Sequence, residues 1–165
     1  MTPSSRLYPL SWSEAAALAD AVRRRGGKVV TTNGCFDLLH AGHVQYLEDA
    51  RKLGDALIVG LNSDASVKRL KGAERPLNSS DARACVLGAL RAVDAVVVYE
   101  EDTPTEFLKT VRPDIHVKGG DWDPEKMPET PLIRSWGGRV EVLRFVDGFS
   151  TTGLIERARD KDPRR

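Results

Sequence analysis

Strand-like and helix-like segments alternate along most of this chain. Short runs rich in β-branched and other apolar residues, each suited to one buried strand, occupy positions 28–32, 56–61, 95–99, 115–118 and 139–145. Apolar residues recur at helical spacing over 13–25, 44–53, 80–93, 103–111 and from 151 onward. Because strands joined by helices run parallel through right-handed crossovers, this order predicts an α/β fold: a doubly wound, Rossmann-like, five-stranded parallel sheet sandwiched by helices.

The length of the chain fits one domain. Its 165 residues are enough to bury a core without help from disulfides or metals. We therefore expect a single domain over 1–165. It should begin with a helix at about 11–26, stopped by two glycines, and end in a frayed tail at about 160–165.

Composition argues against several classes of partner. The 25 basic and 24 acidic residues are interspersed rather than gathered in stripes, so no nucleic-acid partner is expected. No apolar run reaches membrane-spanning length and the chain does not begin like a signal peptide, so no membrane partner is expected. The two cysteines, Cys35 and Cys85, are isolated, which favours a reducing, cytoplasmic location.

The tetrad His40-Ala41-Gly42-His43 opens the predicted helix that follows the first strand. A helix N-terminus presents unpaired N–H groups and the positive end of the helix dipole, so an anion can bind there. Gly42 would let the anion come close. Histidines three residues apart share a helix face, so His40 and His43 could both donate to one phosphate. The same spacing occurs in zinc sites, but His116 is the one other histidine, so no metal ligands are predicted.

Polar residues follow the predicted strands at their carboxyl ends. In doubly wound sheets, ligands bind beyond these ends, at the point where the strand order reverses. The polar stretches are 33–43 after the first strand, 62–64 after the second, 119–122 after the fourth and 147–152 after the fifth. Their convergence predicts a nucleotide site at this edge of the sheet.

Five sequence runs, taken in order, carry a family resemblance. They are T-N-G-C-F-D-L-L-H-A-G-H at 32–43, N-S-D and K-R-L-K-G within 59–72, residues 86–93, V-K-G-G-D at 117–121 and D-G-F-S-T-T at 147–152. Together they resemble the cytidylyltransferase-like nucleotidyltransferase superfamily, whose hallmark is H-x-G-H. Within it, they are most similar to the D-glycero-β-D-manno-heptose 1-phosphate adenylyltransferases, or ADP-heptose synthases. The chain departs from that pattern at Cys35, where valine is common, and at Phe149, where a small residue is common.

The resemblance implies a reaction and its participants. AMP would pass from ATP to heptose 1-phosphate with release of pyrophosphate, giving an ADP-sugar for lipopolysaccharide or other glycan biosynthesis. A separate sugar kinase would supply the sugar 1-phosphate, and Mg²⁺ would bind mainly through the triphosphate. The sequence leaves the oligomeric state open, with a homodimer as one option.

The same resemblance assigns roles to individual residues. The expected catalytic residues are His40, His43 and Lys71. The expected nucleotide-binding residues are Thr32, Asn33, Gly34, Cys35, Phe36, Gly42, Asn62, Asp64, Lys68, Gly119, Gly120, Asp121, Ser150, Thr151 and Thr152. The expected substrate-binding residues are Asp37, Arg75 and Trp122.

Several of these residues could instead have a purely structural role. Thr32 could be an ordinary strand-end residue. Lys68 and Lys71, which we expect in a loop, could belong to a solvated charge run. One hydroxyl among residues 150–152 could simply cap the last helix, and residues 119–122 could form a turn.

Two other functions are compatible with these patterns. A CTP-dependent cytidylyltransferase acting on glycerol 3-phosphate or a similar phosphate would also carry H-x-G-H and a late S-T-T. A non-catalytic nucleotide-binding regulatory protein could keep the same fold. The intact histidine pair and lysines count against that protein, because a binder needs no transition-state donors.

Overall fold

The parallel sheet that the sequence predicts is present in the computed structural model, which describes residues 8–144 and 148–160. Its strands are β1 (Val29–Gly34), β2 (Ala56–Asn62), β3 (Ala95–Tyr99), β4 (Ile115–Gly119) and β5 (Arg139–Leu143). They pair in parallel in the order β3-β2-β1-β4-β5. The predicted fold class is confirmed, and the strand order reverses between β1 and β4.

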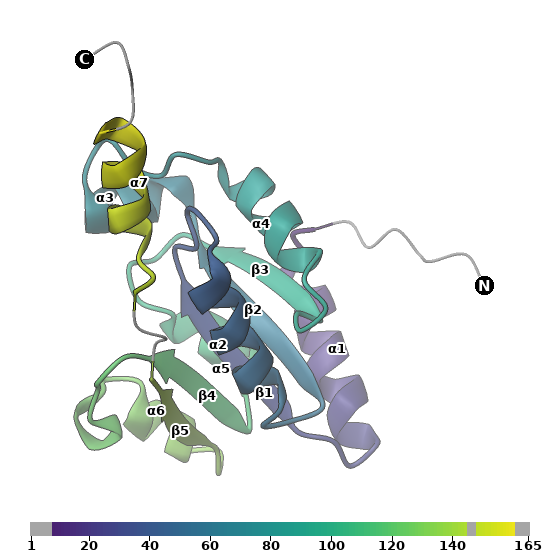
Figure 1. Cartoon of the computed structure of the whole chain (residues 1–165). Helices are drawn as coiled ribbons and strands as arrows, with labels where there is room; N and C mark the ends of the chain where they lie inside the picture. The colour runs from purple at the N-terminus through teal and green to yellow at the C-terminus, as the bar shows by residue number, and fades with distance from the viewer. Residues whose placement is uncertain (1–7, 145–147, 161–165) are drawn as a thin grey trace.

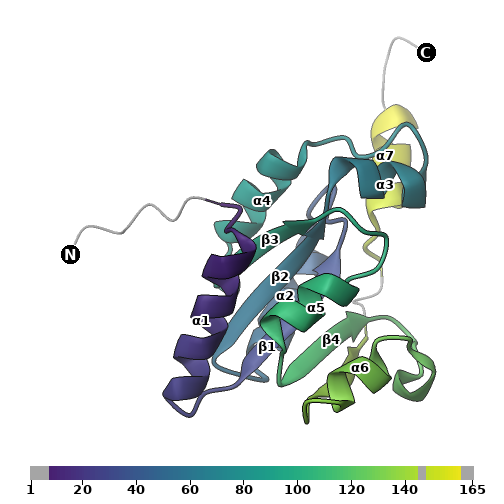
Figure 2. The ribbon, with the colours of Figure 1, turned by 180° about the vertical axis from the view of Figure 1, so that it is seen from behind.

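Helices cover both faces of this sheet. The face toward the viewer in Figure 1 carries α2 (Ala41–Arg51) and α4 (Ser80–Gly88). The face toward the viewer in Figure 2 carries α1 (Trp12–Arg24), α5 (Thr105–Val111) and α6 (Thr130–Arg134). At the carboxyl end of the sheet, both views place two further helices side by side, α3 (Asp64–Lys71) and α7 (Thr151–Asp160). None of the described helices is both long and apolar enough to cross a membrane.

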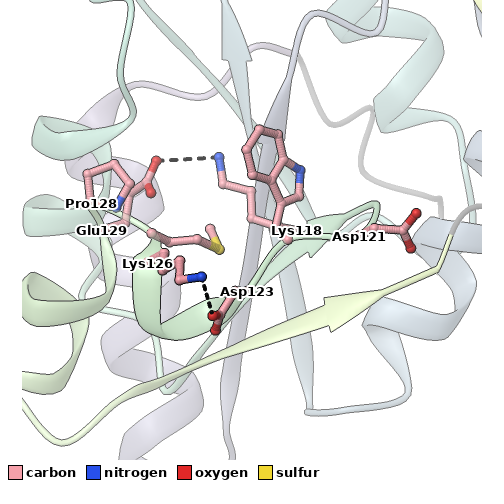
Figure 3. Close-up of a pocket in the computed structure, with 8 residues that line it drawn as sticks. Lys118, Asp121, Asp123, Lys126, Pro128 and Glu129 are labelled. Carbon is pink, nitrogen blue, oxygen red and sulfur yellow. Dashed lines mark ion pairs between the residues drawn. The ribbon is translucent and has the colours of Figure 1, made fainter.

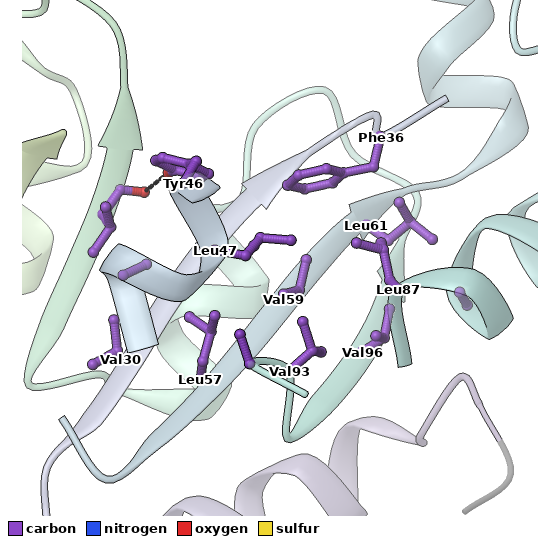
Figure 4. Close-up of a cluster of buried hydrophobic side chains, with 14 of the residues drawn as sticks. Val30, Phe36, Tyr46, Leu47, Leu57, Val59, Leu61, Leu87, Val93 and Val96 are labelled. Carbon is purple, nitrogen blue, oxygen red and sulfur yellow. Dashed lines mark hydrogen bonds between the residues drawn. The ribbon is translucent and has the colours of Figure 1, made fainter. Parts of the chain in front are cut away.

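Apolar side chains on the two faces of the sheet form two cores. On one face, Leu57, Val59 and Leu61 of β2 pack with Leu47 of α2 and Leu87 of α4 (Figure 4). On the other face, the buried residues are Ala15, Ala19, Val22, Ile58, Val97, Phe107 and Ile133. Every residue of β2 is buried, as expected for a strand covered on both sides.

The sequence prediction was wrong between 64 and 71, where we expected a loop. Ser63 caps α3 by accepting a hydrogen bond from the Ser66 N–H, and the helix ends at Gly72, whose φ is 100°. Of its eight residues, only Ser66 and Val67 are buried. A helix this short and this polar has almost no apolar periodicity, so the pattern did not reveal it.

Two other elements also differ from the predicted bounds. The helix expected over 80–93 ends at Gly88, and the chain then turns into β3. A short 3₁₀ helix, η1 (Pro124–Lys126), and α6 occupy a stretch that lacked a regular pattern. We expected a frayed tail at about 160–165. Residues 161–165 of that tail lie outside the described residues.

Gly60 gives a test of how tightly β2 packs against α5. A Cβ atom at Gly60 would lie 2.8 Å from ring atoms of the buried Phe107. We expect Gly60→Ala to lower the free energy of unfolding by about 1–3 kcal/mol, because the ring has no room to move away. Urea unfolding would measure this change.

The matched control is the double variant that carries both Gly60→Ala and Phe107→Leu, compared with each single variant. If the clash is the cause, the double variant should be more stable than the sum of the single effects predicts. Additive effects would show that Gly60 matters for a reason other than the Phe107 ring.

Candidate active site

A hollow of about 160 Å³ lies beyond the carboxyl ends of β1 and β4, where the strand order reverses. Its lining residues are Asn33, Gly34, Cys35, Phe36, His43, Tyr46, Lys118 and Gly119. Most of them were predicted site residues, so the structure brings the polar ends of these two strands together as expected.

His40 and His43 form a stacked pair at the start of α2. His40 is the N-cap residue, and its Nδ1 accepts a hydrogen bond from the His43 backbone N–H at 3.3 Å. Because Nδ1 is the acceptor, neutral His40 carries its proton on Nε2. The two rings stack with centroids 3.8 Å apart. His40 therefore caps the helix and still offers a donor on the far side of its ring.

Burial keeps both imidazoles neutral. It lowers the pKa of His43 to about 4, with a further contribution from the nearby His40, and it also lowers the pKa of His40. The Nδ1 atom of His43 is buried and has no hydrogen-bond partner among the described residues. At neutral pH the pair can donate hydrogen bonds to a phosphate but brings no formal positive charge.

Close packing around the first strand shapes the loop that leads to the histidines. Phe36 adopts a left-handed conformation, with φ of 42°, and its ring lies 5.4 Å from that of His43. A Cβ atom at Gly42 would lie 3.0 Å from Cβ of Phe149 and 3.1 Å from Nδ1 of His40. A side chain at position 42 would therefore force His40 or Phe149 to move by a few tenths of an ångström.

Asp37 and Arg75, predicted to bind substrate, contact each other. The Asp37 carboxylate accepts hydrogen bonds from the Leu77 and Asn78 backbone N–H groups, at 2.8 and 3.2 Å, and forms an ion pair with Arg75. Its side chain is only 1% exposed. Both carboxylate oxygens are thus used to hold the loop before α4, an arrangement that explains these two residues without a ligand.

A buried arginine that the sequence analysis did not assign to the site holds the neighbouring loops. Arg83 donates to the Cys35 carbonyl at 2.6 Å, to the Asn78 carbonyl at 3.0 Å and to the Asp64 carboxylate at 2.7 Å. Asp64, predicted to bind nucleotide, is therefore engaged by Arg83.

Burial raises the pKa of the Cys35 thiol, against the opposing effect of Lys71 and other nearby cations. Cys35 is thus a neutral thiol at pH 7.

Three further predicted nucleotide ligands have side chains committed to the protein itself. The Thr32 hydroxyl lies 2.6 Å from the Tyr46 hydroxyl, and Thr32 is fully buried. The Asn33 amide donates to Tyr99, and Asn62 accepts from the same Tyr99 hydroxyl. These side chains therefore already have hydrogen-bond partners within the protein.

Lys68 and Lys71 lie on α3, not in the loop that we predicted. Both are exposed in the last turn of the helix, where cations interact favourably with the helix dipole. No ion pair involves either side chain within 8–144 and 148–160. Lys71 lies near enough to the first loop to affect the Cys35 thiol, which leaves it available to a ligand in this region.

The predicted hydroxyl run lies at the N-terminus of α7. The Ser150 hydroxyl accepts a hydrogen bond from the Gly153 N–H at 2.9 Å, so Ser150 caps the helix, and Thr151 donates to the Leu38 carbonyl at 3.2 Å. Thr152 is exposed.

The Phe149 ring, just before α7, lies 5.9 Å from that of His40. The N-termini of α2 and α7 therefore meet, and each provides free N–H groups for an anion. Asp147, which begins the D-G-F-S-T-T run, lies outside the described residues.

A second, larger hollow of about 510 Å³ opens at the carboxyl end of β4 (Figure 3). Its lining residues are Lys118, Asp121, Trp122, Asp123, Lys126, Met127, Pro128 and Glu129. Asp121 and the 63% exposed Trp122 were predicted site residues, and Gly119 and Gly120 connect them to the strand. The sequence analysis did not assign Lys118 or Glu129 to the site, although Lys118 stands within the quoted V-K-G-G-D run.

Metal ligands are scarce around this site. No group of three His, Cys, Asp or Glu side chains within 8–144 and 148–160 could hold a metal ion. Asp37, the carboxylate nearest to the histidine tetrad in sequence, is already engaged by Arg75 and two N–H groups.

The fold and this pair of helix N-termini define a nucleotidyltransferase. Residues 31–157 match the family described as cytidylyltransferase-like, and the chain belongs to that family. The chain is 60% identical over 139 residues to bifunctional protein HldE of Syntrophotalea carbinolica, and 57% identical over 148 residues to that of Proteus mirabilis. These matches cover 84% and 90% of this chain but 28% and 31% of those proteins.

A solved structure is also similar. The lipopolysaccharide core biosynthesis protein from Thermoplasma volcanium is 31% identical, with a TM-score of 0.60, and the match covers 73% of this chain and 98% of that one. The predicted resemblance to the cytidylyltransferase-like family is thus confirmed. The chain spans less than a third of the length of the two HldE proteins.

The low pKa of His43 predicts how stability depends on pH. An unfolded histidine titrates near 6.5 but folded His43 near 4, so below 6.5 the unfolded chain binds more protons than the folded one. The free energy of unfolding should fall as the pH drops from 6.5 to about 4. Denaturant unfolding across this window should show a shallower fall for His43→Gln, which cannot take up the proton.

His40→Gln is the matched control, because His40 is the less buried of the pair. It should change the pH dependence less than His43→Gln does. Equal pH dependence in the wild type and His43→Gln would contradict the neutral, buried state of His43.

Proposed function

We propose that this chain transfers AMP from ATP to a sugar 1-phosphate, heptose 1-phosphate, and releases pyrophosphate. The observation that carries the proposal is the neutral, stacked pair His40–His43 where two helix N-termini meet at the switch point of the sheet. Similarity to the HldE proteins and to a lipopolysaccharide core biosynthesis protein supports a sugar phosphate as the acceptor.

The reaction needs no nucleophile from the protein. An oxygen of the sugar 1-phosphate attacks the α-phosphorus of ATP, and the bond to the leaving pyrophosphate breaks with its electron pair. Catalysis then depends on holding the two phosphates in line and on stabilising negative charge in the transition state. Cys35, the cysteine nearest to the reacting groups, is a neutral thiol and takes no part in this scheme.

Neutral histidines suit this task as hydrogen-bond donors. His40 can donate through Nε2 because its Nδ1 is used for capping. The free N–H groups of α2 and α7 would bind phosphate oxygens from the same side. Lys71, whose charge acts on the loop after β1, would approach from α3.

The proposed participants follow from this chemistry. Mg²⁺ would bind through the oxygens of the triphosphate and neutralise part of its charge, and no protein ligand is assigned to it. A separate sugar kinase would supply the sugar 1-phosphate. A cytoplasmic location would give the enzyme its nucleoside triphosphate.

Replacing His43 by alanine separates an enzyme from a binder. We expect kcat to fall about 100- to 1000-fold, because a donor aimed at the transition state is lost, while the affinity for ATP changes little. Pyrophosphate release would measure the rate, and calorimetry the affinity. His43→Asn, which keeps a donor, should retain more activity than His43→Ala. A proportional loss of rate and affinity would instead indicate a non-catalytic nucleotide-binding protein.

Combining several nucleotides with several phosphate acceptors tests whether ATP and heptose 1-phosphate are the substrates. Pyrophosphate release should be confined to ATP with heptose 1-phosphate when ATP, CTP and GTP are each combined with heptose 1-phosphate and glycerol 3-phosphate. Release with CTP and glycerol 3-phosphate would replace the proposal by a cytidylyltransferase. No release in any combination would contradict both.

A further inference from the structure

Lys118 is the one lysine or arginine among the eight residues that line the smaller hollow. His43, which lines the same hollow, is neutral at pH 7. A phosphate that enters this space would therefore find donors in the lining, and the one formal positive charge among the lining residues would be that of Lys118. Because a phosphate group carries at least one negative charge, the ammonium of Lys118 is the natural counterion within the hollow.

Lys118 also lines the larger hollow, where it is held by two partners. Its Nζ donates to Oδ1 of Asn33 at 2.7 Å and lies 3.5 Å from Oε1 of Glu129 (Figure 3). The side chains of Lys118 and Glu129 are 20% and 10% exposed. Burial lowers the pKa of Lys118, and Glu129 opposes that shift. Glu129 thus keeps the cation charged in a poorly solvated place.

A directed chain of hydrogen bonds fixes the orientation of Asn33. Lys118 donates to Asn33, which donates to the Tyr99 hydroxyl, and this hydroxyl donates to Oδ1 of Asn62. Asn62 in turn donates to Ser66, which donates to the Glu101 carbonyl. Because Lys118 can only donate and Asn33 must accept from it, reversing the Asn33 amide would turn its NH₂ toward the ammonium. The chain therefore places Lys118 before any ligand arrives.

We propose that Lys118 is a phosphate-binding residue, whose ammonium shifts from Glu129 to a phosphate oxygen in the hollow beside His43. This inference rests on the proposed function only in taking the ligand to be one of its two phosphate-bearing substrates. The lining of the larger hollow carries three carboxylates, Asp121, Asp123 and Glu129, against two lysines. It therefore suits the uncharged, hydroxyl- or amino-bearing ring of that ligand better than its phosphate.

Three substitutions test the proposal. Lys118→Met removes the charge at nearly the same length, Lys118→Arg keeps the charge, and Glu129→Gln removes the competing carboxylate. The control is Lys52→Met, because Lys52 follows the C-terminal end of α2, lines neither hollow, pairs with Asp49 and has a 67% exposed side chain. Calorimetry would measure binding of α,β-methylene-ATP and of heptose 1-phosphate separately, after thermal unfolding shows that each variant is folded.

Lys118→Met should weaken binding of one of these ligands about 10- to 100-fold, as expected for loss of a charge-assisted hydrogen bond. The ligand affected identifies the source of the phosphate. Lys118→Arg should retain most of the affinity, and Lys52→Met should bind as the wild type does. Glu129→Gln should bind the same ligand at least as tightly as the wild type, whereas a purely structural ion pair would make it bind more weakly.

Two results would overturn the inference. One is a folded Lys118→Met variant that binds both ligands as the wild type does, and the other is equal weakening by Lys118→Arg and Lys118→Met. Failure of the proposed function is distinguishable, because it would appear as absence of pyrophosphate release by the wild type. Lys118-dependent binding of a phosphate ligand would still support the inference in that case.

Discussion

The buried guanidinium of Arg83 is the interaction on which the arrangement of the site depends. It joins three segments far apart in sequence: the loop after β1 through the Cys35 carbonyl, the start of α3 through Asp64, and the loop before α4 through Asn78. The Arg83 side chain is fully buried, so loss of any of these partners would leave a charge poorly compensated. Asp37 also connects the loop after β1 to the loop before α4, through its ion pair with Arg75 and its hydrogen bond from the Leu77 N–H.

In this arrangement, the hydrogen-bond donors and the formal charges of the site belong to different residues. The histidines are neutral because partial burial lowers the pKa of both, so they can approach a phosphate together without repelling each other. In the proposed reaction, formal positive charge would come from lysines on other elements, Lys71 on α3 and Lys118 on β4. A nucleotidyl transfer needs both, since donors set the geometry of the phosphates and cations offset the charge that builds up on them.

The fold could be predicted because its periodicity is strong, and the position of the histidine tetrad at the start of α2 because a helix start is a local property of sequence. The bonds made by other polar residues were not predictable. Thr32, Asn33 and Asn62 stand where ligands usually bind, but their partners are Tyr46 and Tyr99, which are distant in sequence. The helix that carries Lys68 and Lys71 was missed because it buries only two of its eight residues.

These internal bonds change how a polar strand end should be interpreted. A side chain that gives up an internal hydrogen bond to bind a nucleotide leaves its former partner unpaired, and a buried unpaired group costs about 1–3 kcal/mol. Asn33 and Tyr99 therefore act by orienting Lys118, whereas Lys118 can exchange Glu129 for a phosphate and keep an anionic partner throughout. A cation held this way is already in place when the substrate binds, so little reorganisation remains for the chemical step.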